Sequence, residues 1–143
     1  MAVTVSFFNN FIEDVGRNRI NIATDTFKVA LVNGYSFDAT DADYASVSNT
    51  LITENGYTAP GQNLINITWA FGSGVTKFDA DNISWVADGG SITATGAIIY
   101  SDTSSSPTAD RLVCYIDFGE TVEAEDDVSF KIIFNNSGIL TIG

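Results

Sequence analysis

Aspartate residues occur in two short groups that could bind a cation. Asp38, Asp41 and Asp43 form one group, and Asp79 and Asp81 form the other. Alternate aspartates can supply the oxygen ligands that Ca²⁺ prefers. Neither group has the remaining residues of a calcium-binding loop. Because aspartate also fixes turns and caps helices, we interpret both groups as structural and predict neither a metal site nor a cofactor.

A second acidic run lies near the C-terminal end of the chain and comprises Glu120, Glu123, Glu125, Asp126 and Asp127. Two carboxylates facing each other in a cleft can hydrolyse a glycosidic bond. The run surrounds a predicted strand end or hairpin, where charged side chains also discourage sheets from pairing edge to edge. We therefore interpret it as a solvated acidic tip and keep a polysaccharide-cleaving enzyme as an alternative.

Other residue types that carry catalysis are scarce. The chain has no histidine, which removes the commonest general base near neutral pH. Cys114 is its one cysteine, so no internal disulfide can form, and its alternation with Leu112 and Ile116 predicts a buried thiol. Trp69 and Trp85 could line a sugar site, but they fall in phase with neighbouring isoleucines and are predicted core aromatics. We predict that the protein is not an enzyme.

Length and charge limit the classes of partner. With 143 residues, of which 45% are hydrophobic, the chain is sized for one folded domain. It carries 18 acidic against 6 basic side chains, a formal charge of −12, which argues against binding to nucleic acid or to an anionic membrane. No apolar run is long enough to span a bilayer, and the N-terminus lacks the basic start of a signal peptide. We expect synthesis in a cytoplasm.

The N-terminal part has the spacing of a short helix. We predict a helix from Phe7 to Val15, capped by Ser6 and ended by Gly16, and assign residues 1–20 to an N-terminal arm with this helix. The two consecutive phenylalanines could pack on the subunit's own core or on a neighbour. Large apolar side chains at a chain end would be a liability in a free monomer, so we predict assembly contacts there. The predicted contact residues are Val3, Val5, Phe7, Phe8 and Phe11.

The rest of the chain has the alternation of short strands separated by turns. Strands are predicted at 27–32, 65–71, 81–87, 91–100, 112–118, 128–134 and 139–142, and the stretch 36–63 is predicted to hold at most one short element, near 44–52. In the second strand, Ile65, Ile67, Trp69 and Phe71 are expected on one apolar face. Gly96 within a strand predicts a bulge or a close backbone approach. We predict a mainly β fold, an antiparallel β-sandwich or barrel-like domain over residues 21–143, with the short N-terminal helix before it.

Several stretches, in this order, resemble a family of small virion proteins of tailed phages. They are DTFKVALVN at 25–33, ENGYTAPGQNL at 54–64, ATGAIIY at 94–100, IDFG at 116–119 and FNNSGIL at 134–140. The order and spacing match from about residue 7 to the C-terminus. The resemblance implies a capsid decoration, or cement, protein and no catalytic residues.

The resemblance gives a specific functional expectation. The protein would bind the major capsid protein on the outer surface of the phage head, as a homotrimer, and stabilise the head. A high acidity suits a subunit on the outside of a capsid, away from the packaged DNA. The alternative is a structural component of the phage tail or fibre that binds a host glycan.

Overall fold

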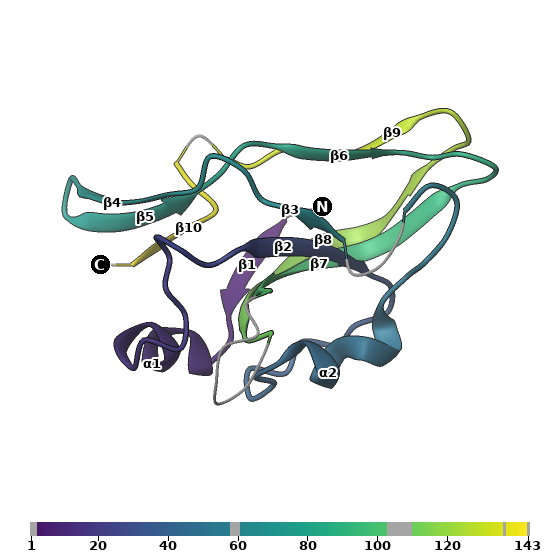
Figure 1. Ribbon diagram of the computed structural model, residues 1–143. Coiled ribbons are helices and arrows are strands. Elements are labelled where there is room, and N and C mark those ends of the chain that lie inside the picture. The colour runs from purple at the N-terminus through teal and green to yellow at the C-terminus, as the bar shows by residue number, and fades with distance from the viewer. Residues whose placement is uncertain (1–2, 58–60, 103–109, 136, 143) are drawn as a thin grey trace.

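The computed structural model describes residues 3–57, 61–102, 110–135 and 137–142, and it consists mainly of antiparallel strands in packed layers (Figure 1). The predicted fold class, a mainly β sandwich-like domain with a short N-terminal helix, is confirmed. The largest sheet has the strand order β1-β8-β7-β2-β3. These strands are β1 (Thr4–Phe7), β2 (Phe27–Val32), β3 (Gln62–Asn63), β7 (Ile92–Ser101) and β8 (Leu112–Ala124).

Two smaller sheets form a second layer over one face of this large sheet (Figure 1). One pairs β6 (Ile83–Val86) with β9 (Ser129–Ile132), and the other has the order β10-β5-β4. Its strands are β4 (Thr68–Gly72), β5 (Val75–Asp79) and β10 (Leu140–Ile142). The opposite face of the large sheet is covered by α2 (Tyr44–Val47) and by a 3₁₀ turn at Ser48–Thr50, whereas α1 (Asn10–Gly16) places Phe11 in the core under the second layer.

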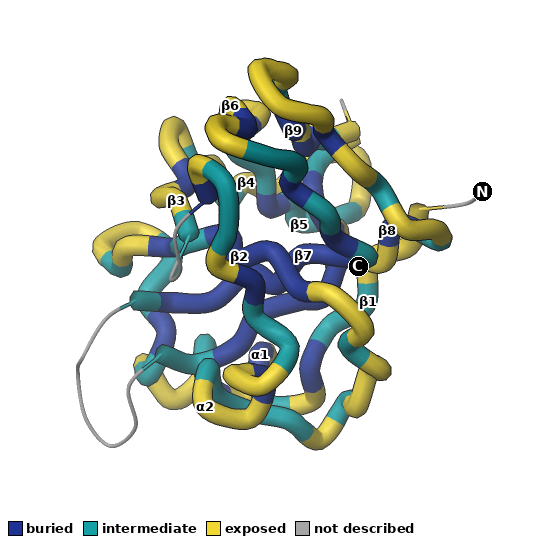
Figure 2. The backbone as a smooth tube through the Cα atoms, turned by 90° about the vertical axis from the view of Figure 1, so that its right-hand side faces the viewer, coloured by how far each residue is buried: buried dark blue, intermediate teal, exposed yellow. Residues whose placement is uncertain are grey.

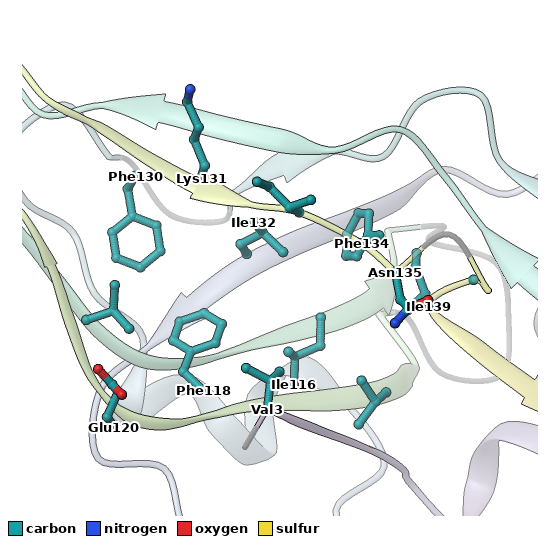
Figure 3. Close-up of a pocket in the computed structure, with 14 residues that line it drawn as sticks. Val3, Ile116, Phe118, Glu120, Phe130, Lys131, Ile132, Phe134, Asn135 and Ile139 are labelled. Atoms are coloured by element: carbon teal, nitrogen blue, oxygen red, sulfur yellow. The ribbon is translucent and has the colours of Figure 1, made fainter. Parts of the chain in front are cut away.

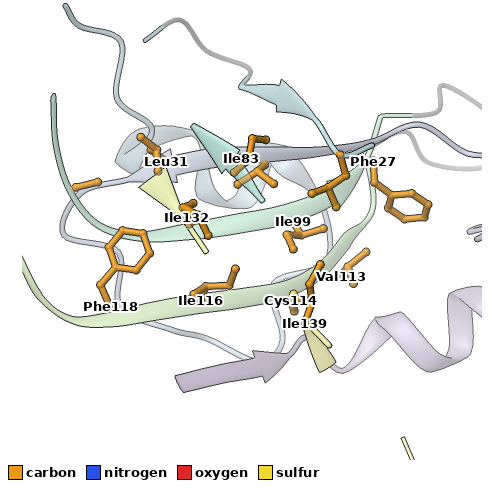
Figure 4. Packing of buried hydrophobic residues seen from close by; sticks show 14 of the residues in the cluster. Phe27, Leu31, Ile83, Ile99, Val113, Cys114, Ile116, Phe118, Ile132 and Ile139 are labelled. Atoms are coloured by element: carbon orange, nitrogen blue, oxygen red, sulfur yellow. The ribbon is translucent and has the colours of Figure 1, made fainter. Parts of the chain in front are cut away.

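The middle of the large sheet is buried on both faces, which explains why its strands read as nearly continuous apolar runs. Phe27 and Leu31 of β2 belong to the main core, under the second layer. Ala30 and Val32, on the other face of the same strand, belong to a separate core against α2. Figure 2 shows the central strands buried and the loops around them exposed. In Figure 4, isoleucines of β7 and β8 meet Ile83 and Ile132 of the second layer.

The N-terminal segment differs from its prediction. The chain forms strand β1 up to Phe7, and the helix begins only at Asn10. Ser6 lies within β1 and does not cap the helix. Apolar residues at 3, 5 and 7 also alternate with polar ones, and pairing of β1 with β8 selects this two-residue period over the helical one. Residues 4–7 are therefore an edge strand of the main sheet.

The strand predicted at 65–71 begins later, at Thr68. Ile65 precedes it and is 59% exposed, and Phe71 at its far end is 77% exposed. The apolar face expected for these residues is therefore wrong at both ends. Only its middle holds, because Trp69 packs against the main core. The reason is that β4 and β5 form a hairpin that extends beyond the core, so the tip has nothing to pack on (Figure 1).

A buried carboxylate joins the helix to the large sheet. Asp14 of α1 is fully buried, and the Arg111 Nε donates to its Oδ2 at 2.7 Å. The side chains of Asn10 and Arg19 donate to the same carboxylate at 2.6 and 3.2 Å. Burial raises the pKa of Asp14, but the hydrogen bonds from Arg111, Asn10 and Arg19 outweigh this effect and hold the pKa below its usual value. This cluster fixes α1 against Arg111, the residue that immediately precedes β8.

The close approach predicted at Gly96 is present. The pairing of β7 with β8 shifts register between Ala94 and Gly96. A Cβ atom on Gly96 would lie 2.5 Å from Cε1 of Tyr115 and 2.6 Å from the carbonyl oxygen of Ile116. No side chain fits at this position without moving the backbone.

We expect Gly96→Ala to lower the free energy of unfolding by about 1–3 kcal/mol, because the added methyl group overpacks a fully formed core. Gly72→Ala is the matched control: Gly72 also lies in a strand, and nothing lies within 4 Å of a Cβ built there. The control should stay within about 0.5 kcal/mol of the parent. Chemical denaturation measures both variants, and equal effects would contradict the packing described for Gly96.

Candidate functional site

Members of both aspartate groups make hydrogen bonds within the fold: Asp79 accepts from the backbone N–H of Ala80, and Asp81 accepts from the Asn66 side chain. Asp43 caps α2 by accepting from the backbone N–H of Ser46, and Asp38 accepts from the backbone and the hydroxyl of Thr40. The hydrogen bonds from Thr40 lower the pKa of Asp38. Within the described ranges, no three acidic or cysteine side chains are grouped so as to hold a metal ion.

The residues of the acidic run lie in two places: three of them form an exposed turn, and Glu120 lies apart from it. Glu125, Asp126 and Asp127 are exposed at the turn between β8 and β9, as interpreted for a solvated acidic tip. Asp126 accepts from the backbone N–H of Gly89, which ties this turn to the one that follows β6. Glu120 lies apart from the tip and lines the groove described below.

Cys114 and the two tryptophans contribute to packing. Cys114 is fully buried, and burial raises the pKa of its thiol, so the reactive thiolate form is disfavoured. Trp85 packs edge-on against Tyr57 with ring centroids 5.2 Å apart, and Trp69 packs edge-on against Phe11 at 6.3 Å. Both tryptophans are half-buried against the main core, which supports their interpretation as core aromatics.

An apolar groove of about 780 Å³ opens on one side of the sandwich, between the two layers (Figure 3). One wall comes from β9, where Phe130 and Ile132 point toward the large sheet. The facing wall comes from β8, where Ile116 and Phe118 point back toward β9. The rings of Phe118 and Phe130 are 6.0 Å apart. Since these side chains are buried members of the main core, the groove is an opening into that core.

The groove exists because the second layer is narrower than the large sheet. Val3 and Val5 line the groove and, like Phe7 behind them, lie on the face of β1 that looks toward the second layer. That layer ends at β9, so β1 is left uncovered and Val3 and Val5 remain 61% and 40% exposed. Ile133, just beyond β9, lies at the opposite rim and is 72% exposed.

Charge is confined to the edges of the groove. The Glu120 side chain stands at one end of it, on β8 (Figure 3). Lys131 belongs to β9, but its side chain points away from the facing sheet. A ligand lying along the groove would therefore meet apolar side chains from both walls, the Glu120 carboxylate at one end and the Asn135 amide near the other.

The predicted assembly residues separate into two sets. Val3 and Val5 lie on the surface at the groove, and Phe7 is half-buried against the main core. Phe8 and Phe11 are only 1% and 0% exposed, so these two predicted contact residues are not available to a partner. Pairing of β1 turns Phe8 into the core beside α2, and α1 places Phe11 in the main core.

Two residues of the groove were not foreseen. Ile133 follows Ile132 directly, which breaks the alternation of the last long strand, and this break is the signal that one of the two faces solvent. Glu120 was assigned to the acidic tip because it is close to that run in sequence. Its place in the groove follows from the two-residue alternation that puts it on the same face of β8 as Ile116 and Phe118, and this spacing is the signal that could have found it.

Comparison of the chain with protein-family models, with curated proteins and with solved structures finds no match. Among the described residues, the helices are all too short to cross a membrane.

Proposed function

We propose that the chain is a non-enzymatic decoration protein of a tailed-phage head, and that it binds the outer capsid surface through the groove. The observation that carries this proposal is the uncovered apolar surface of Val3, Val5 and Ile133 around an opening into the core. Exposed apolar surface next to a groove is typical of a binding face. The sequence resemblance supplies the capsid as the partner.

The proposed mechanism is adhesion rather than catalysis. Docking would remove Val3, Val5 and Ile133 from water and close the groove against a neighbouring capsid subunit. Each copy that bridges two capsid subunits would then add resistance to the internal pressure of the packaged DNA. A trimeric state belongs to this proposal as well, because three linked copies would hold three capsid subunits at one junction.

A tail or fibre component that binds a host glycan is the second candidate. It is favoured by Phe71, a 77% exposed aromatic ring at the tip of the β4–β5 hairpin, since aromatic faces commonly stack on sugar rings. Labelling the protein in purified virions distinguishes the two candidates. Many copies distributed over the head support the decoration protein, and a few copies on the tail support the alternative.

Retention on purified capsids in high salt tests how the protein is held. We expect it to stay bound during a wash at about 1 M NaCl, where the Debye length is only roughly 3 Å and surface charge attraction is screened. Apolar burial does not depend on this attraction. Co-sedimentation after the wash measures the bound fraction. Complete release would show that charge, and not the apolar groove, holds the protein on the shell.

A further inference from the structure

The edge of β9 that borders the groove has backbone groups without a strand partner. Phe134 donates its backbone N–H to Oδ1 of Asn82, at the β6 side, and the carbonyl of Val128 accepts from Ala87 on that same side. Because backbone groups of successive strand residues point to opposite sides, Lys131 and Ile133 direct theirs to the other edge. In the part of the chain that the structure describes, β9 pairs with β6 alone.

A strand is therefore missing from the second layer at the place where the groove lies. The large sheet extends past β8 to β1, whereas the second layer ends at β9, above β8. An added strand beside β9 would lie over β1 and would cover Val3 and Val5. It would also satisfy the free backbone groups of Lys131 and Ile133, which are the template that an exposed sheet edge offers.

We propose that the groove binds an extended segment of a partner protein, which pairs with the free edge of β9 and completes the second layer of the sandwich. Every second side chain of the segment would be apolar and would point onto Val3, Val5 and Ile116. This inference deepens the proposed function and rests on it only in taking the capsid as the source of the segment.

The negative charge of the chain indicates which kind of segment would bind in the groove. Glu120 stands at one end of the groove and favours a basic side chain at the matching end of the segment. A second copy of this chain is disfavoured as the donor, because each copy carries a formal charge of −12 and like charges repel. The segment that fits is apolar in alternate positions, has a basic end and comes from a different protein.

Two substitutions at Ile133 separate backbone pairing from apolar contact. Ile133→Pro replaces the isoleucine side chain by a ring and removes the outward N–H, whereas Ile133→Ala shortens the side chain and keeps the N–H. Proline is tolerated where the N–H of an edge strand faces solvent, so both variants should fold. Thermal unfolding of each variant verifies this before binding is measured.

The probe is a synthetic peptide of alternating valine and threonine with a lysine at each end. We expect it to slow amide hydrogen exchange at Lys131 and Ile133 of the full chain. Ile133→Pro should bind it at least about tenfold more weakly than Ile133→Ala, because an acceptor on the peptide loses its donor. A peptide with a glutamate at each end should bind more weakly than the lysine peptide.

The same variants are tested on purified capsids, so that the two proposals can fail separately. If capsids bind the parent chain but the peptide protects neither amide, or Ile133→Pro matches Ile133→Ala, strand pairing is wrong and the decoration role stands. If the peptide pairs with β9 and capsids do not bind, strand pairing stands and the decoration role is wrong. Protection of the same amides that rises with protein concentration, without peptide, would assign the groove to a second copy and overturn the proposed partner.

Discussion

Asp14→Asn should lower the free energy of unfolding by about 3–5 kcal/mol, the usual cost of removing one partner from a buried ion pair. The Asp14 carboxylate is fully buried, and the Arg111 guanidinium that binds it through Nε and Nη2 is largely buried too. The asparagine keeps the shape of the side chain but leaves the charge of Arg111 without its partner. Urea denaturation of the variant and the parent measures the difference.

Glu13→Gln is the matched control on the same helix. Glu13 pairs with Arg17 at 2.8 Å, but both side chains are more than half exposed. Exposed pairs of this kind contribute about 0–1 kcal/mol, so the control should be nearly as stable as the parent. If the two variants lose the same amount of stability, the Asp14 cluster does not fix α1 to the sheet as described.

The same carboxylate predicts a dependence of stability on pH. The pKa of Asp14 is lowered from the ordinary 3.8, so the folded state binds its proton less readily than the unfolded state does. The stabilisation is therefore complete at pH values above 3.8 and is lost as the pH falls below that value, through the folded pKa. The stability of Asp14→Asn should fall less steeply in this acidic range, and parallel curves for the two proteins would contradict the assignment.

Val5→Asp should weaken capsid binding at least about tenfold, because docking would bury a carboxylate without a partner on the apolar floor of the groove. Thr4→Asp adds the same charge to the adjacent position of β1, on the face away from the groove. Both residues are exposed, so neither substitution should unfold the sheet. Quantitative co-sedimentation compares the two variants, and equal loss of binding would show that negative charge on β1, and not the groove, controls docking.

The point substitution is a sharper test than a deletion of the N-terminal arm. Thr4–Phe7 pairs along β8 in the large sheet, so removing residues 2–6 would expose the edge of β8 as well as remove the groove wall. A loss of capsid binding in such a deletion could come from either change. Val5→Asp alters the groove and leaves the strand in place.

The strands were predictable where both faces of the strand are buried, because apolar residues then fill nearly every position. Phe27 to Val32 reads as a strand because apolar residues fill every position but Lys28, and the turn at Gly34 follows directly. The close approach of other atoms to the backbone at Gly96 was predictable, because a glycine within a strand often marks a bulge or such an approach. Asp38 and Asp43 were predictable as turn and cap residues from their type and neighbours.

The groove and the Asp14 cluster were not predictable in the same way, because each depends on contacts between distant parts of the chain. Arg111 meets Asp14 across 97 positions, and no local pattern links the two. The helical spacing from Phe7 competed with a strand alternation from Val3, and only the presence of β8 beside it decides the outcome. The exposure of Val3 and Val5 depends on where the second layer ends, which follows from the strand order.

A cryo-EM map of the phage particle tests the decoration role most directly. The account predicts density for this chain in many copies on the outer surface of the head, with the edge of β9 and Val5 turned toward the shell. An extended capsid segment should lie beside β9 and over Val3. Density for the chain only on the tail, or on the head with the groove facing solvent, would contradict the account.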